Sequence, residues 1–319
     1  MALTTDFDVN PYYDDYDETK GFYRVLFRPG YAVQAREVTQ LQTILQKQVE
    51  RYGKHTFSEG SIVLGCDLNY DNQIKSVKLE TQFAGADLTI TDFENTTITG
   101  GASNATAKVV ATAASSTTDQ PTLMVQFQSS TEFNDGETLT VTGTTTQANT
   151  VSATGASGVA DSVGAGSVVS CSSGVFYVGG FFIFKDAESL ILEKYSNTPS
   201  YRVGFQTTES IVTSDSDTTL LDPAQGAYNY AAQGATRYKI ELTLSSKTFS
   251  SADDVEAAAD ANFYQLLKVD NGVKVDQVKY PVYSELERTL ARRTHDESGD
   301  YTISPFNLEL VDHRGVTGR

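Results

Sequence analysis

The sequence predicts a mainly β fold with a few α-helices, an α+β protein built from several modules. Three observations lead to this prediction. Among 319 residues there are 24 glycines, no tryptophan and 39 % hydrophobic residues, which is typical of a soluble, β-rich chain. Most apolar runs are short and bounded by turn residues, and only residues 33–52 carry a long helical pattern. We therefore expect antiparallel β-sandwich or barrel modules plus an N-terminal arm and one long helix.

Shifts in composition divide the chain into four parts. We expect an extended arm over residues 1–21, a strand-helix-strand attachment region over 22–83, an inserted β module rich in Thr, Ser and Gly over 84–166, and an aromatic-rich α+β domain over 167–319. Within the inserted module, short apolar runs are separated by turn residues, which favours a small sandwich or barrel.

The arm is dense in Asp, Glu and Tyr and poor in aliphatic residues between positions 6 and 20. Alone, such a segment buries too little apolar surface to offset its ordering entropy. It is therefore either a mobile tail or an arm that becomes ordered on a neighbouring subunit, with Tyr12, Tyr13 and Tyr16 as anchors. Its acidic residues lack the glycine and the terminal glutamate of a calcium loop, so we predict no metal site.

Residues 22–27 predict a strand, ended by Arg28-Pro29-Gly30 because proline removes a backbone donor and glycine permits the turn. A helix over 33–52 follows, rich in Gln and Glu, and Gly53 marks its expected end.

This helix carries a narrow apolar stripe. Its members, which fall within an arc of about 80°, are Val38, Leu41, Leu45, Val49 and Tyr52, with Ile44 on the flank. A strict heptad would place Gln48 rather than Val49 in the seam, so a straight helix on a sheet or a partner is favoured over a long coiled coil.

The helix also has a face rich in neutral hydrogen-bond donors and acceptors. It is formed by Gln34, Thr39, Gln40, Gln42, Thr43, Gln46 and Gln48. One interpretation is an ordinary solvated surface. The other is a helix packed between protein surfaces, since amides form hydrogen bonds without the desolvation cost of an ion.

Further elements follow in order. Strands 62–68 and 74–79 should pair around a turn at 69–72. For the inserted module over 84–166, disorder is the alternative to the strands given below. The remaining expected elements are strands at 88–90, 107–111, 123–127 and 139–141, a hairpin over 174–184, strands at 190–192, 201–205 and 237–244, helices at 251–268 and 284–293, a turn at Asn271-Gly272, and a strand at 300–310.

No motif of an enzyme occurs. His55, His295 and His313 lie far apart without metal-ligand spacing, and nucleotide-binding and nucleophile motifs are missing. We therefore predict no enzymatic activity, no catalytic residue, no cofactor and no metal. Cys66 and Cys171 are expected to be buried reduced thiols, because a disulfide cannot be inferred without geometry.

The formal net charge of -17 argues against a nucleic-acid binder, which needs a basic surface. No run approaches the ~20 apolar residues of a membrane span, and no secretory leader is expected at the start of the chain. We expect no nucleic-acid partner, no membrane insertion and synthesis in a cytoplasm.

Three stretches resemble baseplate and tail-fibre proteins of contractile-tailed phages, including cyanophages. They are NPYYDDYD with KGFYRVLFRPGYAVQAREVTQLQTILQKQVERYG and FSEGSIVLG, then GVFYVGGFFIFKDAESLILE with LLDPAQGAYNYAAQGATRYKIELTL, then LARRTHDESGDYTISPFNLEL. The resemblance covers about two thirds of the chain and carries no catalytic motif. It implies a virion structural protein that connects fibres to the tail by subunit contacts.

The resemblance also implies partners. We expect a homo-oligomer of two or three copies, contacts with other baseplate or tail-fibre proteins, and a location in the virion tail after synthesis in the host cytoplasm. The predicted partner interface consists of Tyr12, Tyr13, Tyr16, Val38, Leu41, Leu45, Val49 and Tyr52. The alternative is a receptor-binding tail adhesin whose insert binds host-surface glycan. A capsule-degrading enzyme is disfavoured because no acid pair stands out.

Overall fold

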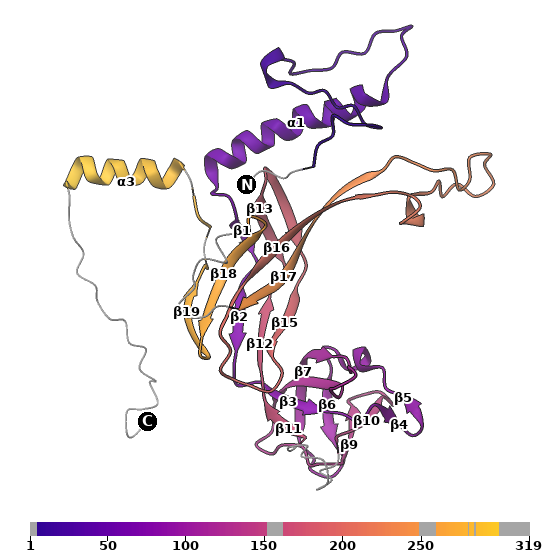
Figure 1. Ribbon diagram of the computed structural model, residues 1–319, viewed down its shortest axis with the longest axis vertical. Coiled ribbons are helices and arrows are strands. Elements are labelled where there is room, and N and C mark those ends of the chain that lie inside the picture. The colour runs from indigo at the N-terminus through magenta and orange to yellow at the C-terminus, as the bar shows by residue number, and fades with distance from the viewer. Residues whose placement is uncertain (1–4, 152–161, 249–259, 280, 284, 300–319) are drawn as a thin grey trace.

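The structure, a computed structural model, describes residues 5–151, 162–248, 260–279, 281–283 and 285–299. The predicted mainly β fold with a few helices is confirmed. Figure 1 shows a central body of long strands with helix α1 at one end and a small β module at the other.

The body contains three antiparallel sheets. One has the order β1-β13-β14 and another the order β15-β12-β2, while a four-stranded sheet runs β17-β16-β18-β19. Their bounds are β1 Ser61–Gly65, β2 Leu68–Asp71, β12 Ser167–Cys171, β13 Gly174–Val178, β14 Phe181–Lys185, β15 Glu188–Glu193, β16 Tyr201–Val212, β17 Arg237–Thr248, β18 Phe263–Asp270 and β19 Val273–Gln277. All three sheets contribute to one hydrophobic core, where the rings of Phe176 and Phe205 meet edge to face with centroids 5.0 Å apart.

A predicted hairpin and a predicted alternating strand are confirmed in the body. Strands β13 and β14 pair across the Gly179-Gly180 turn, where both glycines have positive φ, as a tight connection requires. Strand β17 alternates as predicted, with Leu242 and Leu244 buried and Lys239 exposed. It pairs with β16 over its whole length.

The small module is built on a seven-stranded sheet of order β10-β9-β6-β7-β8-β3-β11. The bounds are β3 Lys75–Lys78, β6 Thr97–Gly100, β7 Thr106–Ala113, β8 Thr122–Phe127, β9 Thr138–Val141, β10 Gln147–Asn149 and β11 Val163–Ala165, beside the short pair β4 Gln82–Phe83 and β5 Ala86–Asp87. Strands predicted at 107–111, 123–127 and 139–141 are confirmed. The strand predicted at 88–90 is wrong, because the one-turn 3-10 helix η2 (Ile90–Phe93) turns Ile90 and Phe93 into the module core.

The chain leaves the body and returns to it at neighbouring positions. Strand β2 ends at Asp71 and β12 begins at Ser167, and Asp71 lies opposite Val168 in the β2–β12 ladder. The module between them is therefore inserted where an ordinary β-hairpin would have its turn.

Helix α1 spans Ala35–Thr56, longer than predicted. It begins at a capping box in which the Gln34 backbone donates to Glu37, with N···Oε2 2.9 Å. The expected stop at Gly53 is wrong, because the helix continues for another turn. A second helix, α3, spans Glu285–Ser298 and likewise extends beyond the predicted end at residue 293. Short 3-10 turns occur at η1 (Glu18–Lys20) and η3 (Thr218–Leu220).

Three other predictions are corrected. Residues 22–27 form no strand, since no described strand pairs with them. The strands near 62–68 and 74–79 do not pair with each other: β1 pairs with β13, β2 with β12, and β3 with β8 and β11, so residues 69–71 are strand rather than turn.

The helix predicted over 251–268 is wrong where it can be compared, because Phe263–Asp270 form strand β18. Its first part, residues 251–259, lies outside the described residues, as do Ser284 and the strand predicted at 300–310. The Asn271-Gly272 turn is confirmed between β18 and β19.

Candidate subunit interface

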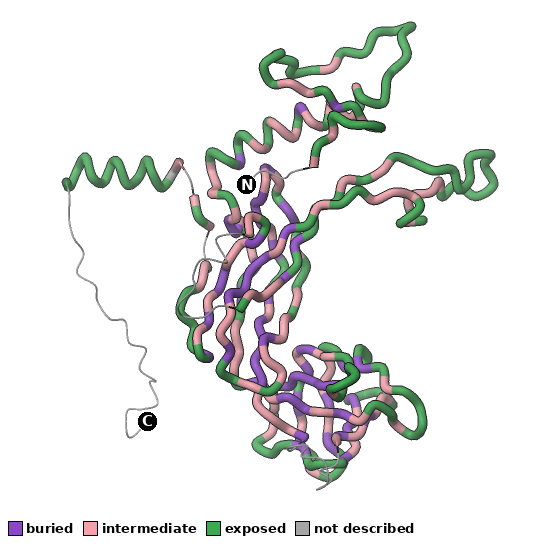
Figure 2. The backbone as a smooth tube through the Cα atoms, viewed as in Figure 1, coloured by how far each residue is buried: buried purple, intermediate pink, exposed green. Residues whose placement is uncertain are grey.

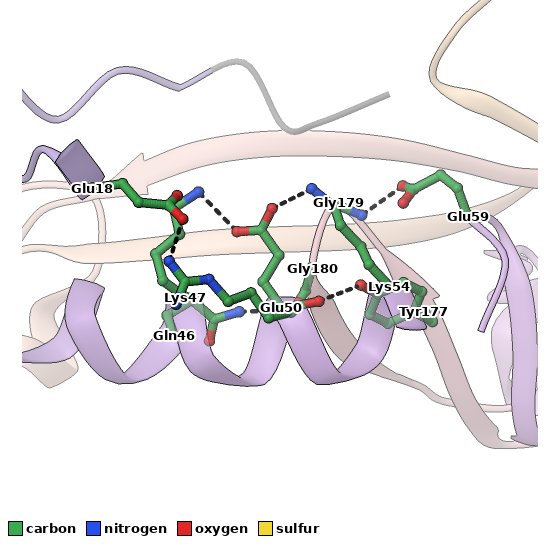
Figure 3. A network of polar contacts seen from close by, with 10 residues as sticks. Glu18, Gln46, Lys47, Glu50, Lys54, Glu59, Tyr177, Gly179 and Gly180 are labelled. Atoms are coloured by element: carbon green, nitrogen blue, oxygen red, sulfur yellow. Dashed lines mark hydrogen bonds and ion pairs between the residues drawn. The ribbon is translucent and has the colours of Figure 1, made fainter. Parts of the chain in front are cut away.

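The inner face of α1 rests on the β13–β14 hairpin. The Gln46 side chain donates to the Gly180 carbonyl with N···O 2.8 Å, and the Tyr177 hydroxyl donates to the Glu50 carbonyl at 3.2 Å. Gly53 is buried against the Tyr177 ring. Figure 3 shows Gln46 and Glu50 on α1 together with their partners Gly180 and Tyr177. The helix is therefore fixed on the body through polar and small residues.

Glu50 ties two turns of the same face together. Its carboxylate accepts from Lys47 at 2.8 Å and from Lys54 in the next turn (Figure 3). Burial raises the pKa of Glu50, but the hydrogen bonds from the two lysines outweigh this and hold it below its usual value. Glu50 therefore stays ionised and fixes the charged edge of the helix toward the body.

The arm covers an adjacent side of α1. Asp14, which is buried, accepts from the Thr43 hydroxyl, and Glu18 forms an ion pair with Arg51. The Gln40 side chain donates to Asp15 at 3.3 Å. The arm is thus ordered on its own chain.

The start of the arm is fixed to the β16–β17 hairpin. The Phe7 ring meets Tyr238 edge to face with centroids 4.9 Å apart, and the Tyr12 hydroxyl lies 2.9 Å from the Thr236 hydroxyl. Glu209 accepts from the Thr5 backbone at 2.9 Å. These contacts span more than 200 residues of sequence, which sequence reasoning could not foresee.

The predicted apolar stripe of α1 faces away from the body and away from the arm. We call Val38, Leu41, Leu45, Val49 and Tyr52 the outer stripe. Four of its side chains are 42 to 69 % exposed, and Leu41 is half-buried. At about 100° per residue, the residues that contact the body and the arm occupy one half of the helix circumference, and the outer stripe lies in the other half. Among the residues that the structure describes, no sheet covers these four exposed side chains.

The flanks of the outer stripe carry no charge. Gln42 borders it on one side and Gln48 on the other, and both are exposed. Helical geometry places no Asp, Glu, Lys or Arg of α1 in the arc of about 120° between these two glutamines. The outer half of α1 therefore presents aliphatic and amide groups, which can be desolvated at lower cost than ions.

The loop before α1 enlarges this exposed region. Together, loop and helix present ten large apolar side chains that are 42 to 74 % exposed, and we call them the apolar surface: Phe22, Tyr23, Leu26, Phe27, Tyr31, Val33, Val38, Leu45, Val49 and Tyr52. Figure 2 shows the loop and much of α1 as exposed. Monomeric soluble proteins rarely expose so many neighbouring apolar groups without a partner.

The predicted site residues separate into two groups. The five residues of the outer stripe share one exposed face. On the arm, Tyr13 is exposed, whereas Tyr12 and Tyr16 are half-buried, and Tyr12 contacts Thr236 of its own chain. Sequence reasoning missed the apolar loop residues between Phe22 and Tyr31 as part of the surface, because it interpreted residues 22–27 as a strand and 28–30 as the turn that ends it. Their density beside a helix with an exposed stripe was the available signal.

Other kinds of site receive no support from the described residues. In those parts of the chain, no group of three His, Cys, Asp or Glu side chains could hold a metal ion. None of the described helices is both long and apolar enough to cross a membrane. Cys66 and Cys171 are buried and free, as predicted.

One family matches most of the chain. It is described as a domain of unknown function, DUF4815, and it matches residues 10–126 and 119–317. No curated protein and no solved structure matches the chain. The family match covers both the apolar surface and the body that holds it.

Proposed function

This chain belongs to the DUF4815 family, whose function is unknown, and we propose that it is a structural component of a bacteriophage virion. In this role it is a baseplate or baseplate-proximal tail-fibre protein that connects fibres to the tail by subunit contacts. The sequence resemblance supports the phage setting, and the apolar surface supports the role in assembly.

The observation that carries the proposal is the position of the apolar surface. Its ten side chains, 42 to 74 % exposed, come from one continuous stretch of the chain. They lie at the end of the molecule that carries α1, away from the inserted module (Figure 1). Covering them with a neighbouring subunit would stabilise the complex by about 25 cal/mol per Å² of apolar area removed from water.

The rest of the molecule suits the same role. The body holds α1 through the β13–β14 hairpin, so the interface keeps a fixed direction relative to the strands. The net charge of -17 keeps free subunits apart in solution before assembly. Partner binding then depends on the uncharged face of α1 and the loop.

The test replaces three loop residues of the apolar surface with serine, Phe22→Ser, Leu26→Ser and Phe27→Ser, in the gene of the phage that encodes the chain. These side chains are 51 to 74 % exposed, so the isolated variant should keep its circular dichroism spectrum and melting temperature. We expect its amount in purified particles, measured by quantitative mass spectrometry, to fall at least about tenfold, as loss of interface anchors predicts.

The matched control carries Val273→Ser and Val275→Ser on β19, which are also exposed apolar residues. It should enter particles at the wild-type level. Wild-type chain that is missing from purified particles would overturn the proposed function, and so would normal incorporation of the triple-serine variant.

A further inference from the structure

The apolar residues of the outer stripe have the same spacing whether they are counted from the N-terminal or the C-terminal end of α1. Counted from Leu45, its residues lie at -7, -4, 0, +4 and +7, namely Val38, Leu41, Leu45, Val49 and Tyr52. The bordering glutamines obey the same rule, because Gln42 and Gln48 lie three residues on either side of Leu45. The whole uncharged face is therefore symmetric about one residue.

A face with this symmetry can bind a copy of itself. A two-fold axis perpendicular to a helix reverses its direction, so each position is placed opposite its mirror position in the second copy. We propose that α1 pairs antiparallel with α1 of a second copy of this chain, with the two-fold axis at Leu45. The inference deepens the proposed function and rests on it, because it names a second copy as one partner of the assembly subunit.

The contacts of the pair follow from the symmetry. Leu45 meets Leu45 and Leu41 meets Val49 in the middle of the seam. The two-fold axis places Gln42 on the same flank as Gln42 of the second copy and Gln48 on the same flank as Gln48, so aliphatic groups face aliphatic groups and amides face amides. Paired amides satisfy each other, since each carries both donors and an acceptor. No ion is buried in this arrangement, which avoids the desolvation cost of a buried charge.

The spacing also indicates how the helices cross. Leu41, Leu45 and Val49 form a ridge with a period of four residues, and ridges of this kind interlock when two helices cross at about 50°. Leu45 then lies at the crossing point. A parallel coiled coil would instead need Gln48 in the seam, where it would bury an amide at the cost of stability.

Charges on α1 are compatible with close approach. Reversal about Leu45 brings Arg36 and Lys54 to the same level, and both are basic. They lie about 180° from the stripe centre on the helix circumference, where Lys54 is engaged with Glu50. The like charges therefore do not meet in the pair.

The first test is the association state of the full chain, measured by sedimentation equilibrium over a range of concentrations. We expect the wild type to dimerise. Leu45→Glu should raise the dissociation constant at least about 30-fold, because it places two carboxylates at the centre of the interface. Leu290→Glu is the matched control: Leu290 is 54 % exposed on α3, against 61 % for Leu45, and this variant should dimerise like the wild type.

The second test fixes the orientation by disulfide trapping. Leu45→Cys should form a cross-linked dimer by itself, because the two-fold axis brings the two thiols together. Leu41→Cys and Val49→Cys chains should cross-link when mixed and at least about tenfold more slowly alone, since helix geometry leaves like positions about 12 Å apart along the axis. The native Cys66 and Cys171 are buried, so the unsubstituted chain serves as the blank.

Two outcomes overturn the pairing: a wild-type chain that stays monomeric at every concentration, or Leu41→Cys chains that cross-link alone as fast as the mixture. Neither outcome affects the loop-serine test in particles. Conversely, a clean antiparallel dimer of a chain that no particle contains would retain the pairing and overturn the proposed function.

Discussion

Gly53 determines how closely α1 approaches the body. A Cβ atom at this position would lie 2.4 Å from Cε2 of Tyr177, whose ring is fully buried. Glycine normally weakens a helix interior, so its presence here reflects close packing rather than a helix end.

We therefore predict that Gly53→Ala destabilises the protein by about 1 to 3 kcal/mol, the usual cost of overpacking. At an unhindered helix position the same change would stabilise by up to about 1 kcal/mol. Urea unfolding measures the difference, and Gln42→Ala, at an exposed position of the same helix, is the control. A Gly53→Ala variant as stable as the wild type would show that Tyr177 can move aside.

In the inserted module, the Glu137 side chain joins two loops through hydrogen bonds. Its buried carboxylate accepts from the Ala102 and Ser103 backbones at 2.9 Å each, from the Ser103 hydroxyl at 2.8 Å and from the Asn134 backbone at 2.7 Å. Burial raises the pKa of Glu137, but these hydrogen bonds together hold it below the ordinary value of 4.5. The ionised carboxylate fastens two loops to each other.

We predict that Glu137→Gln costs about 2 kcal/mol of unfolding free energy at pH 7, where the charged hydrogen bonds are fully formed. Because the folded pKa lies below the unfolded one, this contribution is present above pH 4.5 and is lost as pH falls through the lower, folded value. Urea titrations from pH 7 to about 3 should show the wild-type advantage shrinking. Glu132→Gln, at an exposed ion pair with Lys75, should cost less than about 1 kcal/mol.

At the scale of elements, the arm and α1 depend on each other. The arm contacts the helix through Asp14 with Thr43 and Glu18 with Arg51, and it contacts strand β17 through Phe7 with Tyr238. The arm therefore bridges the helix and the body, and it leaves the outer stripe uncovered.

Deleting the residues before Phe22 should loosen α1 while leaving the hairpin beneath it intact. We expect hydrogen exchange in Ala35–Thr56 to accelerate at least about tenfold, since local opening depends on local contacts, with unchanged exchange in β13 and β14. Mass spectrometry of peptic peptides measures both. Unchanged protection of α1 would show that the β13–β14 hairpin alone holds the helix.

The sequence was sufficient for elements whose pattern is local and insufficient where distant contacts decide. The helix at α1 and the Gly179-Gly180 hairpin follow from periodicity and turn chemistry. Strand β18 was mistaken for a helix because a bulge opposite Val203 and Gly204 leaves Leu266 unpaired, so that Phe263, Leu266 and Leu267 are all buried. That spacing imitates a helical face.

In the candidate site, too, local pattern predicted some features and distant contacts decided the others. Periodicity located the outer stripe, but it could not say which half of α1 the body covers, because that depends on Gln46 reaching Gly180 more than 130 residues away. The pairing partners of β1, β2 and β3 were missed for the same reason, since strand register is set by non-local contacts.

At the scale of the whole molecule, the inserted module joins the body mainly through one point. Its two connections meet at the pair Asp71 and Val168. Beside them, the Lys194 ammonium lies 2.9 Å from Asp119, and the Tyr195 hydroxyl lies 3.1 Å from that of Thr122. A small shared core cluster also spans the joint, with Met124 and Val168 among its members.

We predict that the body folds without the module when residues 72–167 are replaced by Asn-Gly, a two-residue hairpin turn. The loss of cover over Val168 and Ile191 should cost about 2 kcal/mol and lower the melting temperature by about 4 to 8 °C. Circular dichroism and calorimetry measure the change. An unfolded product would show that the body needs the module, and retained dimerisation would place the α1 contact wholly outside it.

The place where the module leaves the body bears on how the chain can vary in length. Both of its connections lie at one end of the β2–β12 ladder, where Asp71 is opposite Val168. Residues added to or removed from the far loops of the module therefore leave the register of that ladder unchanged, and longer surface loops cost little closure entropy. The module can thus grow or shrink while the strands of the body keep their partners.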